Sequence, residues 1–152
     1  MTALEKIQAW IKTYPGSTAL GGFSVDYTGA DPSNGSVMPS GLVEISRTSD
    51  IVGNTTVQCQ YNFTLYFIFP KAPGDDVGSQ ENAQWLLDFQ DWVQAQSMGR
   101  KAPSFGDDPR QETMKAQNGA LYGADEEGTA VYSVQLSANF VRKYEEDNPW
   151  LT

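Results

Sequence analysis

The chain contains no histidine among its 152 residues, and this absence limits its chemistry more than any other feature of its composition. Histidine is the commonest general base and metal ligand, and it usually activates serine and cysteine nucleophiles. The single cysteine, Cys59, excludes a disulfide within the chain and fits a reducing compartment. The sequence carries no evident catalytic equipment, so we expect a protein that is not an enzyme and has no cofactor or bound metal.

Basic residues are scarce as well. Ten lysines and arginines stand against 19 acidic residues, which gives a net charge of -9. Non-specific affinity for nucleic acid comes from clustered Lys and Arg, so the composition argues against a phosphate-binding surface, and we expect no sequence-specific nucleic acid and no membrane as partner; the argument against anionic membranes is the weaker one. The charge mainly favours solubility through self-repulsion.

Long apolar runs are also missing. No run reaches the roughly 18 residues that a membrane-spanning helix needs. The first ten residues, MTALEKIQAW, lack the continuous apolar core of a signal peptide. We therefore expect a protein that is made in a cytoplasm and at least initially stays there.

The chain does have the material for a folded core. Its length is that of one ordinary domain, and hydrophobic residues make up 39% of it, which is not a disordered composition. A domain of this size buries roughly 70% of its unfolded-chain surface. We expect a single domain over residues 1–152, with an acidic, loose C-terminal segment at 145–152.

The N-terminal segment predicts a helix over residues 3–14. Thr2 and Glu5 form a capping-box pair, in which the Thr hydroxyl accepts the Glu5 amide. Pro15-Gly16 ends the helix. One apolar stripe at helical spacing predicts a helix that lies on a sheet; its members are Leu4, Ile7, Ile11 and Tyr14.

Three strands are predicted next. A short strand at 23–28 is followed by a loop at 29–41 that is rich in Gly, Pro, Ser and Asn. A second strand at 42–52 leads through a tight turn at Gly53-Asn54 into a third strand at 55–71. The second and third strands should pair as an antiparallel hairpin.

The third strand, TTVQCQYNFTLYFIFPK, is apolar on one side in its first half and on both sides in its second half. Tyr66 and Ile68 face away from Phe67 and Phe69. Two explanations are about equally good: residues 102–128 cover the second side, or a neighbouring subunit does. At about 3.3 Å per residue the strand is over roughly 50 Å long, so it is expected to bend or to overhang its domain.

A second helix is predicted over residues 80–97. Ser79 is a suitable N-cap, and Gly99 is a suitable residue beyond the C-terminus. Leu87 points away from the apolar stripe into a face of Gln, Asp and Ala. The stripe itself consists of Trp85, Leu86, Phe89, Trp92 and Val93.

The remaining chain predicts a loop at 102–110, a small hairpin at Asn118-Gly119, a turn at 125–128 and a last alternating strand at 130–140. The order is helix, three strands, helix, and two or three strands. We therefore predict an α+β fold with a mostly antiparallel sheet of about five strands and two helices packed on one face.

Candidate chemical groups are few. Cys59 lies on the apolar side of a strand with no histidine to activate it, so we interpret it as a buried structural residue. Acidic groups at Asp75-Asp76, Asp107-Asp108 and 125–127 sit in loops and match no calcium-loop pattern. Solvated turn residues are the first interpretation of these acids, and a weak calcium contact is the alternative.

Four segments together resemble a known family. The chain is similar, nearly throughout and in order, to minor tail or minor capsid proteins of tailed phages and prophages of Gram-positive bacteria. Its architecture also resembles that of tail-terminator and tail-completion proteins. The segments are EKIQAWIKTYP, YNFTLYFIFPK, NAQWLLDFQDWVQ and ALYGADEEGTAVYSVQLSANFVRKY, of which DEEGTAVYSVQL is the most characteristic part.

This resemblance implies an assembly role without catalytic residues. It implies a homo-oligomeric ring at the head-proximal end of the tail tube, with the tail tube protein and a head-completion protein as partners and the virion tail as location. Identical subunits would be joined by heterologous contacts around an acidic lumen suited to DNA passage. We expect Tyr66, Ile68, Phe69 and Leu87 at the subunit interface.

Other functions stay open at this point. A head–tail connector component is the alternative in the same class. A small-molecule-binding or enzymatic domain with an acidic cleft over the sheet is the alternative in a different class. A third is a general interaction module, such as an accessory of a secretion-system tube.

Overall fold

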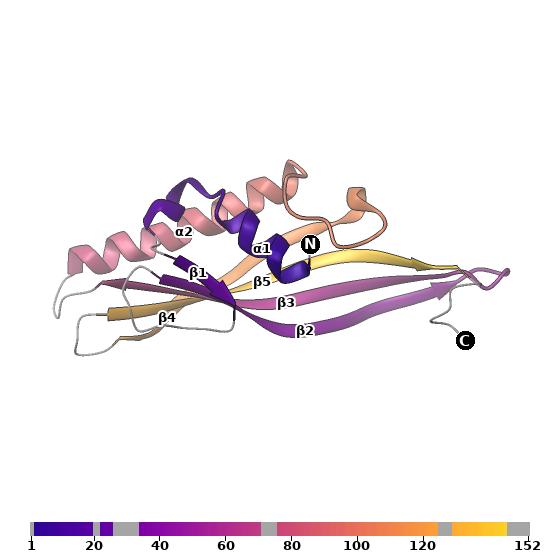
Figure 1. The fold of residues 1–152 in the computed structure, drawn as a ribbon, viewed down its shortest axis with the longest axis horizontal. Helices are drawn as coiled ribbons and strands as arrows, with labels where there is room; N and C mark the ends of the chain where they lie inside the picture. The colour runs from indigo at the N-terminus through magenta and orange to yellow at the C-terminus, as the bar shows by residue number, and fades with distance from the viewer. Residues whose placement is uncertain (1, 20–21, 26–33, 71–75, 125–128, 146–152) are drawn as a thin grey trace.

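The computed structural model describes residues 2–19, 22–25, 34–70, 76–124 and 129–145, which form an α+β fold (Figure 1). The sheet has five strands in the order β1-β2-β3-β5-β4, and both α-helices lie on one of its faces. The elements in chain order are α1 (Ala3–Ile11), η1 (Pro15–Ala19), β1 (Gly22–Val25), β2 (Asn34–Ser49), β3 (Thr55–Pro70), α2 (Asp76–Met98), η2 (Pro109–Gln111), β4 (Thr113–Ala124) and β5 (Thr129–Tyr144).

Three of the four strand pairings are antiparallel. These are β2 with β3, β3 with β5 and β4 with β5, while the short β1 runs parallel to β2. The predicted α+β class and the mostly antiparallel sheet are confirmed. The parallel pairing of β1 was not predicted, because neighbouring strands in a chain usually pair as antiparallel meanders.

Helix α1 begins as predicted and ends earlier. The Thr2 hydroxyl accepts the Glu5 amide at 3.2 Å, as the capping pattern requires. The α-helix stops at Ile11, and two tighter bonds follow, from Thr13 N to Trp10 O at 2.9 Å and from Tyr14 N to Ile11 O at 3.0 Å. This tightening brings Tyr14 down onto α2.

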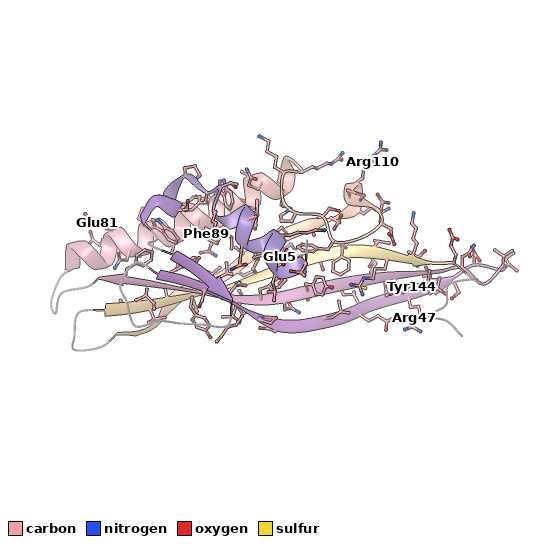
Figure 2. All side chains as sticks on the ribbon, viewed as in Figure 1. Glu5, Arg47, Glu81, Phe89, Arg110 and Tyr144 are labelled. Atoms are coloured by element: carbon pink, nitrogen blue, oxygen red, sulfur yellow. The ribbon has the colours of Figure 1, made fainter. Side chains whose placement is uncertain are left out.

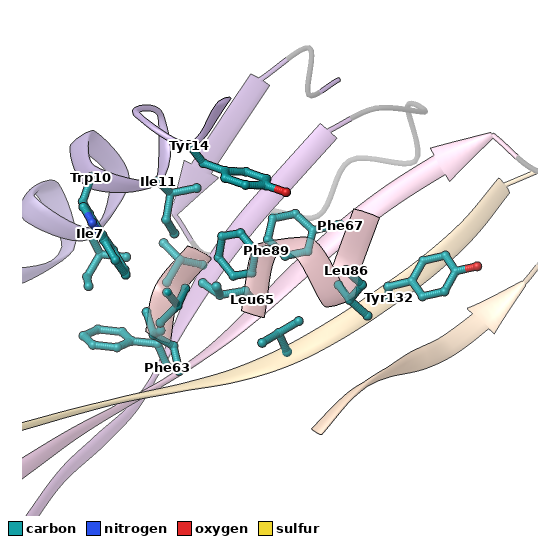
Figure 3. Packing of buried hydrophobic residues seen from close by; sticks show 14 of the residues in the cluster. Ile7, Trp10, Ile11, Tyr14, Phe63, Leu65, Phe67, Leu86, Phe89 and Tyr132 are labelled. Atoms are coloured by element: carbon teal, nitrogen blue, oxygen red, sulfur yellow. The ribbon is translucent and has the colours of Figure 1, made fainter. Parts of the chain in front are cut away.

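The main core lies between the helices and the sheet (Figure 3). Tyr14 meets Phe89 and Trp85 edge-on, with ring centroids 5.4 and 5.5 Å apart. Phe67 projects from β3 against Phe89 at 5.3 Å. The predicted apolar side of α2 is therefore the side that packs on the sheet. Fully buried side chains of this core include Ile7, Ile11, Val37, Leu65, Phe67, Phe89, Val93, Val134 and Leu136.

Helix α2 is longer than predicted. It starts at Asp76, so Ser79 lies inside the helix and is not its N-cap. At the other end Lys101 N donates to Gln96 O at 2.9 Å and Arg100 N donates to Ser97 O at 3.2 Å, the pair of bonds that ends many helices. Arg100, with φ 58°, takes the left-handed conformation that we predicted for Gly99.

The loop predicted at 29–41 is wrong for its second half. β2 already begins at Asn34, and it pairs with β3 from Gly35 onward. Gly and Pro in this segment mark a bulge between Pro39 and Gly41, where Gly41 has φ 104°. Backbone hydrogen bonds to the long strand β3 keep residues 34–41 extended, although their Gly, Pro and Ser content predicts a loop. Residues 26–33 lie outside the described residues.

The hairpin predicted at Asn118-Gly119 is also wrong. β4 continues through these residues, which form a bulge between the pairs Gln117–Gln135 and Ala120–Ser133. Asn118 does take the positive φ, 57°, that an Asn-Gly turn would require, but within a bulge of the strand. A side chain on Gly119 would meet α2, since its Cβ would lie 2.5 Å from Gln90 Oε1. The packed helix therefore keeps the strand on its course, and the predicted turn at 125–128 lies outside the described residues.

The β2–β3 hairpin overhangs the helices, as the length of β3 suggested (Figure 1). We call residues 42–57 the arm. Its turn is closed by Asp50, whose Oδ1 accepts the amides of Val52 at 3.0 Å and Asn54 at 2.9 Å. Gly53 takes φ 92°, which completes the predicted turn.

Candidate functional site: the arm and the loop 99–112

The four predicted interface residues do not form one surface. Phe69 is 4% exposed and packs on the helix side, with its ring 4.9 Å from that of Trp85. Ile68 is also 4% exposed, on the other side of the strand, where Tyr66 is half-buried. Leu87 is exposed on α2. The single chain already buries Ile68 and Phe69, so these two leave no area for a neighbouring subunit and are corrected as interface residues.

The second side of β3 is covered at this end by the chain itself. Ser36, which pairs with Tyr66, is 1% exposed, and Ile68 beside it is buried too. The loop predicted at 102–110 lies further along the sheet, where the Phe105 ring is 5.6 Å from that of Tyr61. The loop therefore covers the arm end of the helix side and not the region of Ile68.

Exposed apolar side chains collect on the arm instead. Five of the seven large exposed hydrophobic residues in the described chain lie between residues 42 and 52. Ile51, at the turn, has no contact that shields it from solvent. Isolated exposed hydrophobic residues are ordinary, but a concentration on one projecting element marks a contact surface. The five are Leu42, Val43, Ile45, Ile51 and Val52.

This surface was not predicted from the sequence, because the apolar pattern of β3 is stronger than that of residues 42–52 and drew the interface prediction to β3. The signal was present in LVEISRTSDIV, where apolar residues stand at both odd and even positions. A strand with one buried face does not need Leu42 and Val43 side by side. Leu42 pairs with Tyr61 and Val43 pairs with Gln60, so the two point to opposite faces of the arm.

Side chains of α2 protect the outer edge of β4 against the addition of another strand. Met114 N donates to Ser97 Oγ at 2.9 Å, and Gln90 Nε2 donates to Ala116 O at 3.2 Å, so side chains of α2 occupy the outer edge of β4. Unpaired edges invite strand addition, and covering them with a helix prevents it. The edge of β4 is closed in this way.

Loop residues close the edge of β5 beyond the start of β4. Asp107 N donates to Val141 O at 2.8 Å, and Lys143 N donates to a carboxylate oxygen of Asp107 at 2.7 Å. Gly106 is required here, because its Cβ would lie 2.3 Å from Val141 O. Asp107 therefore bonds the loop to β5 at two successive points.

Along the arm, β2 is the outermost strand in the described chain. β1 pairs with β2 only up to Val37, so residues 38–49 have no strand on that side. Pro39 lacks an N–H, and one-residue bulges interrupt the ladder near Ser40 and Ile45. Proline and bulges are the usual protection against strand addition. The arm is thus suited to contacts through its side chains more than through its backbone.

The loop 99–112 is held rigidly by its acidic residues. Glu112 accepts the amides of Phe105 at 2.6 Å and Gly106 at 3.2 Å, and it also accepts the Ser104 hydroxyl. Lys6 Nζ donates to Ser104 O at 2.7 Å, which ties the loop to α1. These carboxylates stabilise backbone groups, so they act as structural acceptors.

The loop 99–112 carries three bases and three acids, and the Arg110 side chain projects from it (Figure 2). Arg100, Lys101 and Arg110 are exposed, and Lys6 lies close by. The one salt bridge between described residues lies elsewhere, from Arg47 to Glu44 at 2.6 Å. Glu112 and Asp107 accept backbone amides, so the guanidinium groups of Arg100 and Arg110 stay available for a contact from outside the described chain.

A hollow of about 140 Å³ opens beside these bases. Arg100 and Arg110 lie on its wall, and Pro103, Phe105 and Met114 contribute apolar surface. Its volume is close to the roughly 150 Å³ of a dry cavity that accepts benzene. The hollow can therefore accept one branched aliphatic side chain, with an anion beside it.

A second, wider hollow of about 370 Å³ follows the helix side of the arm. It contains Glu44 and Arg47, and its floor includes Cys59 and Arg142. Burial raises the pKa of the Cys59 thiol, although the nearby Arg142 charge acts in the opposite direction. The thiol is therefore neutral at pH 7 and is a poor nucleophile, in line with the structural role that we predicted.

Neither hollow resembles the acidic cleft of the alternative hypothesis. Each contains one carboxylate and two guanidinium groups. Within the residues that the structure describes, no three His, Cys, Asp or Glu side chains come together as a metal site would require. Asp108 caps η2 through its contact with Arg110 N at 3.3 Å. Asp75 and the acids at 125–127 lie outside the described residues.

The sheet face away from the helices is polar and carries no acidic side chain on its described strands. Gln60 Nε2 donates to Asn139 Oδ1 at 3.2 Å, and Ser137 Oγ donates to Asn62 Oδ1 at 3.2 Å. Lys115 and Lys143 are the charged residues on this face. The described helices include none that is both long and apolar enough to cross a membrane.

Comparison with known proteins adds no relative. No protein-family model matches the chain, and no curated protein matches it either.

Proposed function

We propose that this chain is a non-enzymatic assembly protein of a tailed phage or prophage, of the tail-terminator or minor-tail type. The resemblance in its sequence supports this class, and the arm is the observation that carries the proposal. An element that projects beyond the core and carries five of the seven large exposed hydrophobic residues of the described chain needs a partner surface. The partner in this proposal is a further copy of the same chain.

A closed ring of identical subunits fits this proposal. Each subunit in a ring offers one surface to the preceding copy and a different surface to the next. An arm at one end of a long molecule and the bonded loop 99–112 beside the helices supply two such different surfaces (Figure 1). The ring would cap the tail tube and would present its other side to a head-completion protein.

The charge of the lumen follows from which face points inward. The described sheet face carries amides, hydroxyls and two lysines, so it would make a mostly polar and weakly positive lumen wall. The acidic lumen that the resemblance implies would need another surface. With only two bases on this face, the wall would offer few cations to the phosphates of passing DNA.

The test uses tubes polymerised from the tail tube protein encoded in the same gene module. Purified chain is added during polymerisation, and the tubes are imaged by negative-stain electron microscopy. We expect rings at one tube end and tubes that stop growing. Light scattering across concentration should show a discrete oligomer, alone or on the tubes. A chain that stays monomeric at millimolar concentration and leaves the tubes unchanged would contradict the proposal.

A further inference from the structure

We propose that the tip of the arm, residues 50–52, inserts into the hollow beside Arg100 and Arg110 of a second copy of this chain. This inference rests on the proposed function, since it names the contact by which copies would associate. It assigns different surfaces to the two sides of the contact, which makes the association heterologous.

The tip has the properties of an inserting element. Ile51 is fully exposed and Val52 is 64% exposed, so both would gain by burial. The turn beneath them is preorganised, because Asp50 N donates to Asn54 O at 2.9 Å and Asp50 Oδ1 accepts two amides. A rigid tip loses little conformational entropy on binding.

The hollow matches the tip in size and in charge. Its volume of about 140 Å³ suits one branched aliphatic side chain. Between residues 48 and 54 the tip carries a single charge, that of Asp50. The wall of the hollow carries Arg100, Arg110 and one carboxylate, Glu112, which is already bonded to groups of its own loop. An acid beside two guanidinium groups is the favourable arrangement across an interface.

Arg100 itself supports a binding role for this wall. Its φ of 58° places a long, charged side chain in the left-handed conformation that Gly adopts at lower cost. Strained residues of this kind persist where the surroundings or a function require the side chain. Glycine, the residue that best fits this left-handed conformation, stands one residue earlier in the chain, at Gly99, and the left-handed position itself is occupied by Arg100.

The occupant has to come from another molecule. The turn of the arm lies at one end of the long axis, beyond the loop 99–112, and the arm is held straight by its pairing with β5 (Figure 1). The tip therefore cannot fold back onto the hollow of its own chain. Strand addition to β2 is disfavoured by Pro39 and the bulge beside it at the base of the arm and by the bulge near Ile45 within the arm, so insertion of the tip is the better contact.

The test compares two variants, each altered on one side of the contact. The tip variant is Ile51→Ser with Val52→Ser, which keeps Asp50 and the turn. The hollow variant is Arg100→Gly with Arg110→Glu, which keeps the left-handed backbone and reverses one charge. Lys115→Glu, a charge reversal on an exposed base of the other sheet face, and Leu87→Ser, on the exposed face of α2, are the matched controls.

Masses are measured by light scattering at the concentration where the wild-type chain is oligomeric, with circular dichroism as the check on folding. We expect each altered variant to be monomeric and both controls to keep the wild-type mass. An equimolar mixture of the two variants should form a heterodimer and nothing larger, because one contact of each pair remains intact. This rescue shows that both variants are folded.

Several results would overturn the inference. Either variant keeping the wild-type mass would do so, and a hollow variant that stays oligomeric while the tip variant is monomeric would indicate a tip-to-tip contact. A mixture that stays monomeric would also overturn it, because the intact tip of one variant would then fail to bind the intact hollow of the other. The loss of oligomers in Leu87→Ser alone would move the interface to α2. Variants that still cap tail tubes as rings would contradict this contact and leave the proposed function standing, whereas a wild-type chain that neither oligomerises nor caps tubes would contradict both.

Discussion

Arg142 contacts two aromatic residues beside the base of the arm, Tyr61 on β3 and Phe140 on β5. Its Nη2 donates to the Tyr61 hydroxyl at 2.8 Å, and its guanidinium carbon lies 5.1 Å from the centre of the Phe140 ring. A flat, weakly hydrated cation is suited to both contacts at once. This residue therefore joins β5 to β3 where the helices no longer cover the sheet.

Removing the Tyr61 hydroxyl should weaken the fold. We expect Tyr61→Phe to lower the free energy of unfolding by about 1 kcal/mol, because a hydrogen bond to a charged group is lost. Arg142→Lys keeps the charge but cannot lie flat on Phe140, and it should cost a similar amount. Urea titration measures both. Lys143→Ala, at an exposed neighbour, should change the value by less than about 0.5 kcal/mol. An unchanged midpoint for Tyr61→Phe would contradict this account.

Adding a methyl group at Gly106 should detach the loop from β5. The new Cβ would lie 2.3 Å from Val141 O, which already accepts the Asp107 amide. We expect Gly106→Ala to cost about 2 kcal/mol and to speed hydrogen exchange at the Asp107 amide. Gly99→Ala is the matched control, since its Cβ would lie 3.3 Å from the nearest atom, Ala95 O. Equal effects of the two substitutions would argue against a close approach at Gly106.

Replacing Arg100 by glycine should move stability and association in opposite directions. The left-handed residue costs roughly 1 kcal/mol more for Arg than for Gly. We expect Arg100→Gly to raise the melting temperature by a few degrees and to weaken self-association. Lys101→Gly deletes a neighbouring base without a positive φ, so it should bring no gain in stability. A fall in the melting temperature of Arg100→Gly would mean that contacts of the Arg100 side chain stabilise the fold by more than its left-handed backbone conformation destabilises it.

The buried thiol predicts a dependence of stability on pH. Burial raises the pKa of Cys59 in the folded state, so its neutral form is the one that the fold accepts. The contribution is fully present below the usual thiol pKa of about 8.5, and it is lost as the pH rises through the higher folded value. We expect the difference in unfolding free energy between the wild type and Cys59→Val to change above about pH 8.5 and to be constant below it. A constant difference up to pH 10.5 would contradict this assignment.

Much of the fold could be predicted because the periodic segments are long. The helices at 3–14 and 80–97 and the strands at 55–71 and 130–140 follow from spacing, and each appears in the structure with boundaries shifted by a few residues. The loop and turn signals of Gly, Pro and Asn gave wrong predictions at positions where pairing or packing with a distant segment determines the backbone conformation. The ladder of β3 turns Pro39 and Gly41 into a bulge of a strand, and α2 does the same for Asn118.

The candidate site was harder to predict than the fold. Periodicity shows that Ile68 is apolar on a second side, but it does not show that the chain itself covers that side. The arm surface depends on where the helices end over the sheet, which no local pattern determines. The hollow depends on a loop whose shape comes from Glu112 and from its bonds to β5. Such tertiary arrangements lie beyond the reach of spacing.

The hydrogen bonds that join Gln90 and Ser97 of α2 to β4 link two causes of aggregation that are usually separate, exposure of the core and exposure of a strand edge. While α2 stays docked, it seals the core and also occupies backbone groups of Met114 and Ala116. Any fluctuation that separates α2 from the sheet exposes apolar core surface and the unpaired edge of β4 at the same time. The storage lifetime of the purified protein should therefore be limited by the opening rate of one helix, and additives that slow this opening should delay fibril growth as much as they delay unfolding.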